Sequence, residues 1–352
     1  KRQIYKERIR LKGGARRVSD TIEEGGLGEA DIEAAYGSGD GDLDTSATVA
    51  STPKGQIFEQ IYRPWNGSLG PRWVRNYAIY RHHVYGIISG SGHRRYHPFV
   101  RLALLVVILG SMTPILMLLL SSMVSGDATG FLNRMWGVNR YNLWGNVLGY
   151  FPRNLCMWPL LTALVVGGLV SDDRKNGTSA LYFSRPISRL DYASMKWLSA
   201  ASVLATVILL TYMMYYSAAI VFKGEGWSFI ADTIPIFIGG LVAGIFLVFT
   251  YTSIGIALSS ISTSRFTASV SFLGLILGSK IVAWLVEIQF ETTYIYLLSP
   301  YDCLAHLGQW LVGLPSNYDH PLIMSVVSLL AMNAASLSIF ASRVSSLEVT
   351  RE

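Results

Sequence analysis

Long apolar blocks almost free of charge are the feature of this sequence that most constrains its fold. The stretch from Leu102 to Met123 contains no charged residue, and about 20 apolar residues suffice for a helix to cross a bilayer. Backbone polar groups must be paired within lipid, so such blocks cross as helices. Only 15% of the 352 residues are charged, well below the roughly 25% of an average soluble domain. The sequence therefore predicts an all-α membrane protein.

Six blocks are long enough to cross the membrane. The predicted transmembrane helices are about 102–123, 147–170, 197–222, 233–259, 266–288 and 322–342. Together they make a six-span domain at 102–342, which residues 343–352 follow as a tail. The fifth span contains Lys280 and Glu287, and ionisable side chains at such depth are candidates for function. The alternative is that Lys280 extends to the outer interface and pairs with Glu287.

Basic residues in the connecting loops fall mainly on one side of the predicted spans. Arginine and lysine gather before the first span, between residues 171 and 196, and after the last span. Cytoplasmic loops carry such an excess, so both termini and the 171–196 loop are predicted to be cytoplasmic. We expect a multi-pass protein of the cell (plasma) membrane. The pI of about 9.2 reflects this asymmetry, and we expect no nucleic-acid partner.

The region before the first span divides into two parts by composition. Residues 1–56 are basic and then acidic, and they contain too few apolar residues for a core, which predicts flexibility. Self-pairing or docking on a partner are alternatives. Residues 57–101 are aromatic and basic, and Trp73, Tyr77 and Tyr80 recur at i, i+4 and i+7, on one helical face. This predicts an amphipathic helix at the membrane interface, or else a helix packed on a partner.

No pattern for catalysis or metal binding stands out. Histidines lie outside the spans, and no GxxxxGK[ST] phosphate loop occurs in the chain. His93 and His97 in "HRRYH" have helical ligand spacing, but arginines flank them and no carboxylate is near, which favours attraction to a membrane surface. We therefore predict that the chain is not an enzyme and binds no metal or cofactor of its own.

Small residues spaced by four predict close contacts between helices. The pairs are Gly240 with Gly244, Gly255 with Ser259, and Gly274 with Gly278.

The loop after the second span has the most distinctive sequence in the chain, "GGLVSDDRKNGTSALYFSRPISRLDYASMKW". An acidic-basic cluster at 172–175 precedes Gly177 and Thr178, and "SRPISR" precedes the third span. This loop resembles the cytoplasmic loop of ABC-2 type permeases. Residues 62–81 resemble the N-terminal elbow helix of part of that family. Residues 296–313 resemble its outer re-entrant segment, so the resemblance covers about 60–345.

The resemblance implies a permease subunit of an ABC exporter. In that family the loop forms a coupling helix that fits a separate P-loop ATPase, which binds ATP and Mg²⁺. A second permease subunit, identical or paralogous, is also implied. The residues assigned to ATPase coupling are Asp172, Asp173, Arg174, Lys175, Gly177, Thr178, Arg185, Pro186 and Arg189.

Simple helix rules agree with a short coupling helix at 179–183. Thr178 is suited to cap its start, and Pro186 disfavours helix at Arg185. Asp172 and Asp173 near its N-terminal end suit the helix dipole. We expect the charged cluster of this loop to be exposed.

By analogy with the family, spans two and five line the central pathway. The candidate substrate-facing residues are then Arg153, Asn154, Lys280 and Glu287. Two other functions stay open: a non-transporting membrane scaffold or anchor that recruits cytoplasmic partners, and an ion-driven transporter. The latter normally needs mid-span acidic residues or paired broken helices, and neither is evident.

Overall fold

The structure, a computed structural model, describes residues 70–89, 156–178, 182, 187–223 and 227–349, with eight single positions between 102 and 123. The 1–56 extension, most of the first predicted span and residues 350–352 lie outside this part. So do residues 147–155, with Arg153 and Asn154, and also Arg185 and Pro186. The ordered elements within the described part are all helices, and no strand occurs among them.

Four described helices are long and apolar enough to cross a membrane. They are α12 (Arg189–Lys223), α13 (Trp227–Ile261), α14 (Arg265–Phe290) and α16 (Leu322–Val349). They correspond to the predicted third to sixth spans. The shortest, α14, has 26 residues, or about 39 Å at 1.5 Å per residue, which exceeds the roughly 30 Å hydrocarbon core of a bilayer.

Helix α12 begins eight residues before the predicted span, so the prediction that 189–196 belong to a loop was wrong. The Ser188 hydroxyl accepts a hydrogen bond from Asp191 N at 3.1 Å, which is the N-cap arrangement. The first turns of α12 are therefore fixed by a serine cap, and Arg189 and Lys196 lie on this helix.

Only the C-terminal part of the second predicted span is described. Helix α9 (Met157–Val166) ends four residues before the predicted end at 170, and a turn leads to the five-residue helix α10 (Ser171–Lys175). Ser259 of α13 fixes this turn: its Oγ accepts from the backbone N of Val170 and of Ser171, each at 3.2 Å. It also donates to Gly167 O at 3.0 Å.

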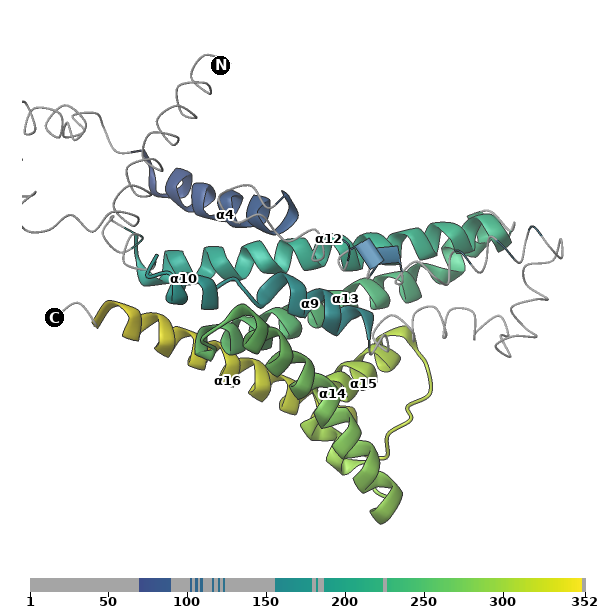
Figure 1. The fold of residues 1–352 in the computed structure, drawn as a ribbon. Coiled ribbons are helices and arrows are strands. Elements are labelled where there is room, and N and C mark those ends of the chain that lie inside the picture. Colours follow the sequence, from purple (N-terminus) through teal and green to yellow (C-terminus); the bar gives the residue numbers. More distant parts are fainter. Residues whose placement is uncertain are drawn as a thin grey trace, which may run out of the picture. The chain divides into compact units, whose positions relative to one another are not determined.

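The amphipathic helix before the spans is α4 (Arg72–Ser89), which runs alongside α12 (Figure 1). Arg72 donates from both Nε and Nη2 to the Asp191 carboxylate, at 2.8–3.1 Å, and Asn76 Nδ2 donates to the same carboxylate at 2.8 Å. These contacts fix the start of α4 against the start of α12.

A short 3₁₀ helix, η1 (Tyr294–Leu298), and α15 (Pro300–Val312) connect α14 to α16. Most of α15 is buried. It packs against α13 so closely that a Cβ added to Gly239 would lie 2.1 Å from Leu311 O. Such a contact requires glycine. The predicted small-residue pair contains Gly240 and not Gly239, so the glycine that makes this contact was not predicted.

Of the predicted small-residue pairs, Gly255 with Ser259 forms a close contact. A Cβ on Gly255 would meet Val166 of α9 at 3.2–3.3 Å. Gly274 and Gly278 face open space, with nothing within 4 Å of a Cβ added at either position, so no contact within the described residues uses them.

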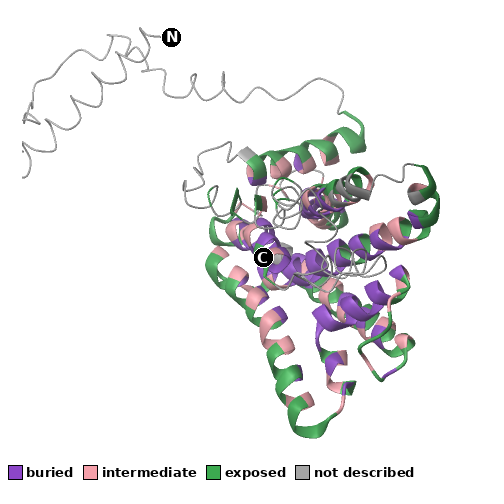
Figure 2. Ribbon diagram, turned by 90° about the vertical axis from the view of Figure 1, so that its right-hand side faces the viewer, coloured by how far each residue is buried: buried purple, intermediate pink, exposed green. Residues whose placement is uncertain are grey.

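Buried apolar side chains come chiefly from α9, α12, α13 and α15. Helices α14 and α16 are different, since only 17% of the residues in their most apolar windows are buried. Figure 2 shows their long exposed faces. Among the large exposed residues of α14 are Val282, Trp284, Leu285 and Ile288. An apolar face of this size is expected where a helix contacts lipid or another membrane helix.

Candidate functional site

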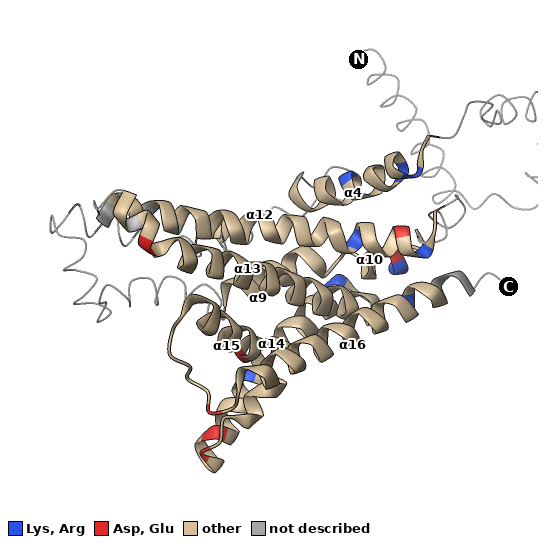
Figure 3. Ribbon diagram, turned by 180° about the vertical axis from the view of Figure 1, so that it is seen from behind, with Lys and Arg blue, Asp and Glu red and all other residues tan. Residues whose placement is uncertain are grey.

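The charged cluster predicted for ATPase coupling forms α10. Asp172 and Asp173 lie in its first turn, and Arg174 and Lys175 in its last, so both pairs complement the helix dipole. Arg174 and Lys175 are exposed. In Figure 3, most of the Lys and Arg residues lie at this end of the molecule together with a few acidic ones, whereas acidic residues gather at the opposite end of α14.

Asp173 is buried, which corrects the expectation that the whole cluster is exposed. Its Oδ2 accepts from Lys196 Nζ at 2.5 Å and from the Tyr192 hydroxyl at 2.9 Å. Burial raises the Asp173 pKa, but the Lys196 ammonium and its hydrogen bond, with smaller effects of His83 and Tyr192, outweigh burial and hold the pKa below its ordinary value. Asp173 therefore attaches α10 to α12.

Arginine side chains attach the same region to the turn between α13 and α14. Arg174 Nη1 donates to Ser260 O at 3.3 Å and to Ile261 O at 3.1 Å, at the C-terminal end of α13, where carbonyls lack helical partners. From the start of α14, Arg265 Nη2 donates to Leu164 O of α9 at 3.0 Å. Helices α9, α10, α13 and α14 thus meet at one end.

Gly177 and Thr178 form the end of α10, while the predicted helix at 179–183 that Thr178 would cap lies, apart from Tyr182, outside the described residues. Gly177 has a positive φ of 64°, the left-handed conformation that glycine adopts readily. Thr178 N donates to Asp173 O at 3.0 Å, and its hydroxyl donates to the same oxygen at 3.3 Å. Thr178 therefore closes the helix that contains the charged cluster. Within the segment 179–186, the structure describes Tyr182 alone.

The predicted aromatic face of α4 is present. The rings of Tyr77 and Tyr80 lie 6.1 Å apart between centroids. Trp73 and Tyr77 are 68% and 54% exposed, whereas Tyr80 is half-buried. Whether this face meets lipid headgroups stays a prediction.

The second cluster surrounds Lys280, about 15 Å before the end of α14 at 1.5 Å per residue. Lys280 Nζ donates to Asp302 Oδ1 at 2.6 Å and lies 4.3 Å from the centre of the Tyr296 ring. Glu287 accepts a short hydrogen bond from the Tyr296 hydroxyl. The alternative that Lys280 pairs with Glu287 was therefore wrong.

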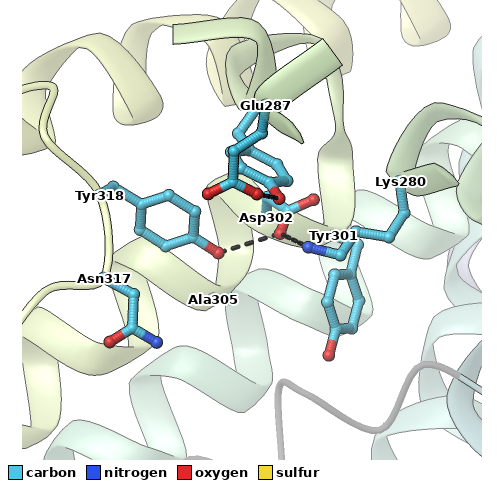
Figure 4. A pocket seen from close by; sticks show the side chains of 8 residues that line it. Lys280, Glu287, Tyr301, Asp302, Ala305, Asn317 and Tyr318 are labelled. Carbon is cyan, nitrogen blue, oxygen red and sulfur yellow. Dashed lines mark hydrogen bonds and ion pairs between the residues drawn. The ribbon is translucent and has the colours of Figure 1, made fainter. Parts of the chain in front are cut away.

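These side chains line a pocket of about 290 Å³. Figure 4 shows Lys280 and the Tyr318 hydroxyl converging on Asp302, with Glu287 close by. The Tyr318 hydroxyl donates to Asp302 Oδ1 at 3.0 Å. The complete lining is Lys280, Glu287, Tyr296, Tyr301, Asp302, Ala305, Asn317 and Tyr318.

Sequence reasoning missed Asp302. The usable signal was Ser299-Pro300 before it, since a serine N-cap followed by proline marks the start of a helix. The Ser299 hydroxyl accepts from Asp302 N at 3.3 Å. This signal predicts the start of α15 but not that α15 lies beside Lys280, which depends on how the chain turns after α14.

Comparison with known families gives a match. The family described as "ABC-2 family transporter protein" matches residues 155–343. This range runs from the start of α9 to Arg343 in the C-terminal part of α16, and it includes both clusters. A comparison with curated proteins gave no match.

Proposed function

The chain belongs to the ABC-2 transporter family, and we propose that it couples ATP hydrolysis on a separate P-loop ATPase to export of a substrate across the membrane. Membership makes it a membrane-embedded permease subunit of an ABC transporter. The proposal adds the site of coupling and the direction of transport.

The observation that carries the proposal is the attachment of α10 to several helices at once. An ATPase that pushes on α10 acts on α12 through Asp173 and Lys196, and on the α13–α14 turn through Arg174. Arg174 and Lys175 remain exposed at this end. A short charged helix with such attachments is suited to transmit a movement of a partner into the membrane, because the Asp173–Lys196 pair is buried and Arg174 binds the end of α13 directly.

The remaining parts of the proposal follow from the family and the sequence. We propose six transmembrane helices with cytoplasmic termini in the plasma membrane, and a second permease subunit, identical or paralogous. ATP and Mg²⁺ would bind the ATPase, and this chain would have no enzymatic activity. Among the residues predicted for coupling, Lys175 and Arg189 are exposed, and we propose that both contact the ATPase.

A pull-down from native membranes in mild detergent tests the proposal, followed by an ATPase assay. We expect a P-loop ATPase to co-purify with the wild-type chain. Lys175→Ala should reduce either the amount bound or the substrate-stimulated activity. Arg343→Ala is the matched control, because Arg343 is an exposed basic residue in α16. It lies at the same end of the molecule as α10 (Figure 1).

Two outcomes would contradict the proposal. Partners without any ATPase would favour the scaffold function. An ATPase that binds and responds equally well in Lys175→Ala and in an added Arg189→Ala variant would show that coupling does not use this surface.

A further inference from the structure

We propose that the pocket around Lys280 binds the protonated amine of the transported substrate, and that Lys280 occupies this cation site when substrate is absent. The inference rests on the proposed function and deepens it by naming a substrate class, organic cations.

The groups around Lys280 Nζ are those that recognise an ammonium ion. One oxygen of Asp302 accepts a hydrogen bond at 2.6 Å. The rings of Tyr296 and Tyr301 have their centres 4.3 Å and 5.8 Å from the nitrogen, within the roughly 6 Å of a cation–π contact. A carboxylate with two aromatic rings binds any compact ammonium, and Lys280 is the one that the chain supplies.

The pocket has one more acidic than basic lining residue, Glu287 and Asp302 against Lys280. Lys280 therefore leaves an excess negative charge that favours a cationic ligand. Asp302 is also incompletely satisfied: its side chain is fully buried, and Oδ2 has no hydrogen-bond partner among the described residues. An unpaired buried carboxylate oxygen is costly, so a ligand with further N–H donors would improve the site.

Lys280 is able to leave this position, whereas Asp302 is fixed. The Lys280 side chain is 25% exposed and Asp302 is 0% exposed, and a lysine side chain has a flexible four-carbon stem. The Asp302 oxygen that binds Lys280, Oδ1, is also held by the Tyr318 hydroxyl. Tyr318 in turn packs against His306 and His320, with ring centroids 5.0 Å and 5.5 Å away. The acceptors are thus held in place, and the occupant is exchangeable.

The location agrees with a site on the transport path. Lys280 lies within the α14 membrane span, on the opposite end of the molecule from α10. A bound amine would release Lys280 toward Glu287, which lies about two turns further along α14. Ion pairing between them would then offset the lost contact with Asp302.

Calorimetric binding to the full chain in lipid nanodiscs, in the complex with its partners, tests this inference with three probes of matched shape. They are 2-phenylethylammonium, neutral 2-phenylethanol and anionic 3-phenylpropionate. We expect saturable binding of the ammonium probe alone. Glu287→Gln and Asp302→Asn should weaken it by roughly tenfold or more, since each removes a charge that faces the ligand.

Lys280→Met gives the sharpest test because its effect has the opposite sign. Removing the internal competitor should tighten binding of the ammonium probe. Glu291→Gln is the matched control for surface charge, since Glu291 is exposed near the same end of α14 and does not line the pocket. The Glu291→Gln variant should bind the ammonium probe with the same affinity as the wild-type chain. Size-exclusion elution and helical content identify any variant that fails to fold. Glu287→Gln leaves the Lys280–Asp302 ion pair intact.

Three results would overturn the inference. The first is preferential binding of 3-phenylpropionate that Lys280→Met abolishes, which would make Lys280 an anion ligand. The second is equal uptake of all three probes, which would indicate partition into lipid. The third is unchanged or weaker ammonium binding in Lys280→Met. ATPase co-purification does not depend on these probes, so the coupling proposal can hold while this inference fails.

Discussion

Lys196 Nζ lies 2.5 Å from Asp173 Oδ2, and the lysine side chain is completely buried. The same ammonium also donates to Leu169 O at 2.5 Å. Two buried charges from α10 and α12 are therefore paired with each other and supplied with hydrogen bonds. Desolvation makes such a pair a weak source of net stability, but removing one partner leaves an uncompensated charge. The pair thus favours one arrangement of α10 on α12.

Asp173→Asn should strongly destabilise the protein. The change leaves the Lys196 ammonium buried without its counter-ion, and comparable losses are about 3–5 kcal/mol. Denaturant unfolding in mixed micelles measures the difference. Asp172→Asn is the control, since Asp172 lies in the same turn but is only half-buried, and its effect should be much smaller. Equal losses in the two variants would contradict the special role of the buried pair.

The double variant Asp173→Asn/Lys196→Met should recover much of the stability lost by Asp173→Asn. It removes both buried charges, and apolar replacement of a buried ion pair is often neutral. Thermal unfolding of the single and double variants in the same detergent measures the recovery. Additive losses would show that the two residues act independently.

The contribution of Asp173 to the stability of the folded protein should be constant from about pH 8 to about pH 5. Its pKa is lower in the folded protein than in the unfolded chain, where a free aspartate has a pKa of about 3.9. The unfolded state therefore binds the proton first on acidification. Stabilisation is complete above the unfolded pKa and is lost as the pH falls through the folded pKa. The stability gap between wild type and Asp173→Asn, followed by pH titration, should close only at acidic pH.

Sequence patterns predicted the helices better than their contacts. The four membrane-length helices of the described part were located because apolar blocks with few or no charges cross lipid as helices. Residues 189–196 were misplaced because their charges suggested a loop, whereas Asp191 and Lys196 are satisfied by Arg72 and Asp173, which are distant in sequence. Periodicity carries no information about such partners.

The two candidate sites were unequally predictable. The α10 cluster was identified from the sequence because its charged residues are consecutive, and consecutive residues remain neighbours in the folded chain. Lys280 was identified from its depth, but its partner Asp302 was not, because that contact requires α15 to return beside α14. Glu287 was a plausible partner at helical spacing, yet the Tyr296 hydroxyl binds it instead.

Gly239→Ala should destabilise the packing of α15 on α13. The new methyl group would lie 2.1 Å from the Leu311 carbonyl oxygen, and overpacking against backbone costs about 1–3 kcal/mol. Gly274→Ala is the control, because nothing lies within 4 Å of that position. Alanine there should be neutral or stabilise α14 by up to about 1 kcal/mol. The changes in unfolding free energy that the two substitutions cause should therefore differ in sign or clearly in size.

Ser259→Ala should loosen the turn between α9 and α10. Its hydroxyl accepts from two buried backbone N–H groups, and leaving such groups unpaired costs about 1–3 kcal/mol. Ser260→Ala is the neighbouring control: it is also buried, but its hydroxyl only donates to Ala257 O within α13. Hydrogen exchange at Val170 and Ser171 should quicken in Ser259→Ala and stay unchanged in Ser260→Ala. Unchanged protection in both would show that the turn does not depend on this hydroxyl.

Cysteine labelling should place the two ends of the helices on opposite sides of the membrane. Arg174 joins α10 to the end of α13, so Lys175→Cys and Thr263→Cys belong to one side, and both positions are exposed. The loop after α15 follows a further membrane-length helix, α14, so Ser316→Cys belongs to the other side. With Cys156 and Cys303 replaced by serine, an impermeant maleimide added to intact cells should label Ser316→Cys only. Labelling of Lys175→Cys in intact cells would reverse the orientation deduced from the basic loops and would place α10 beyond the reach of a cytoplasmic ATPase.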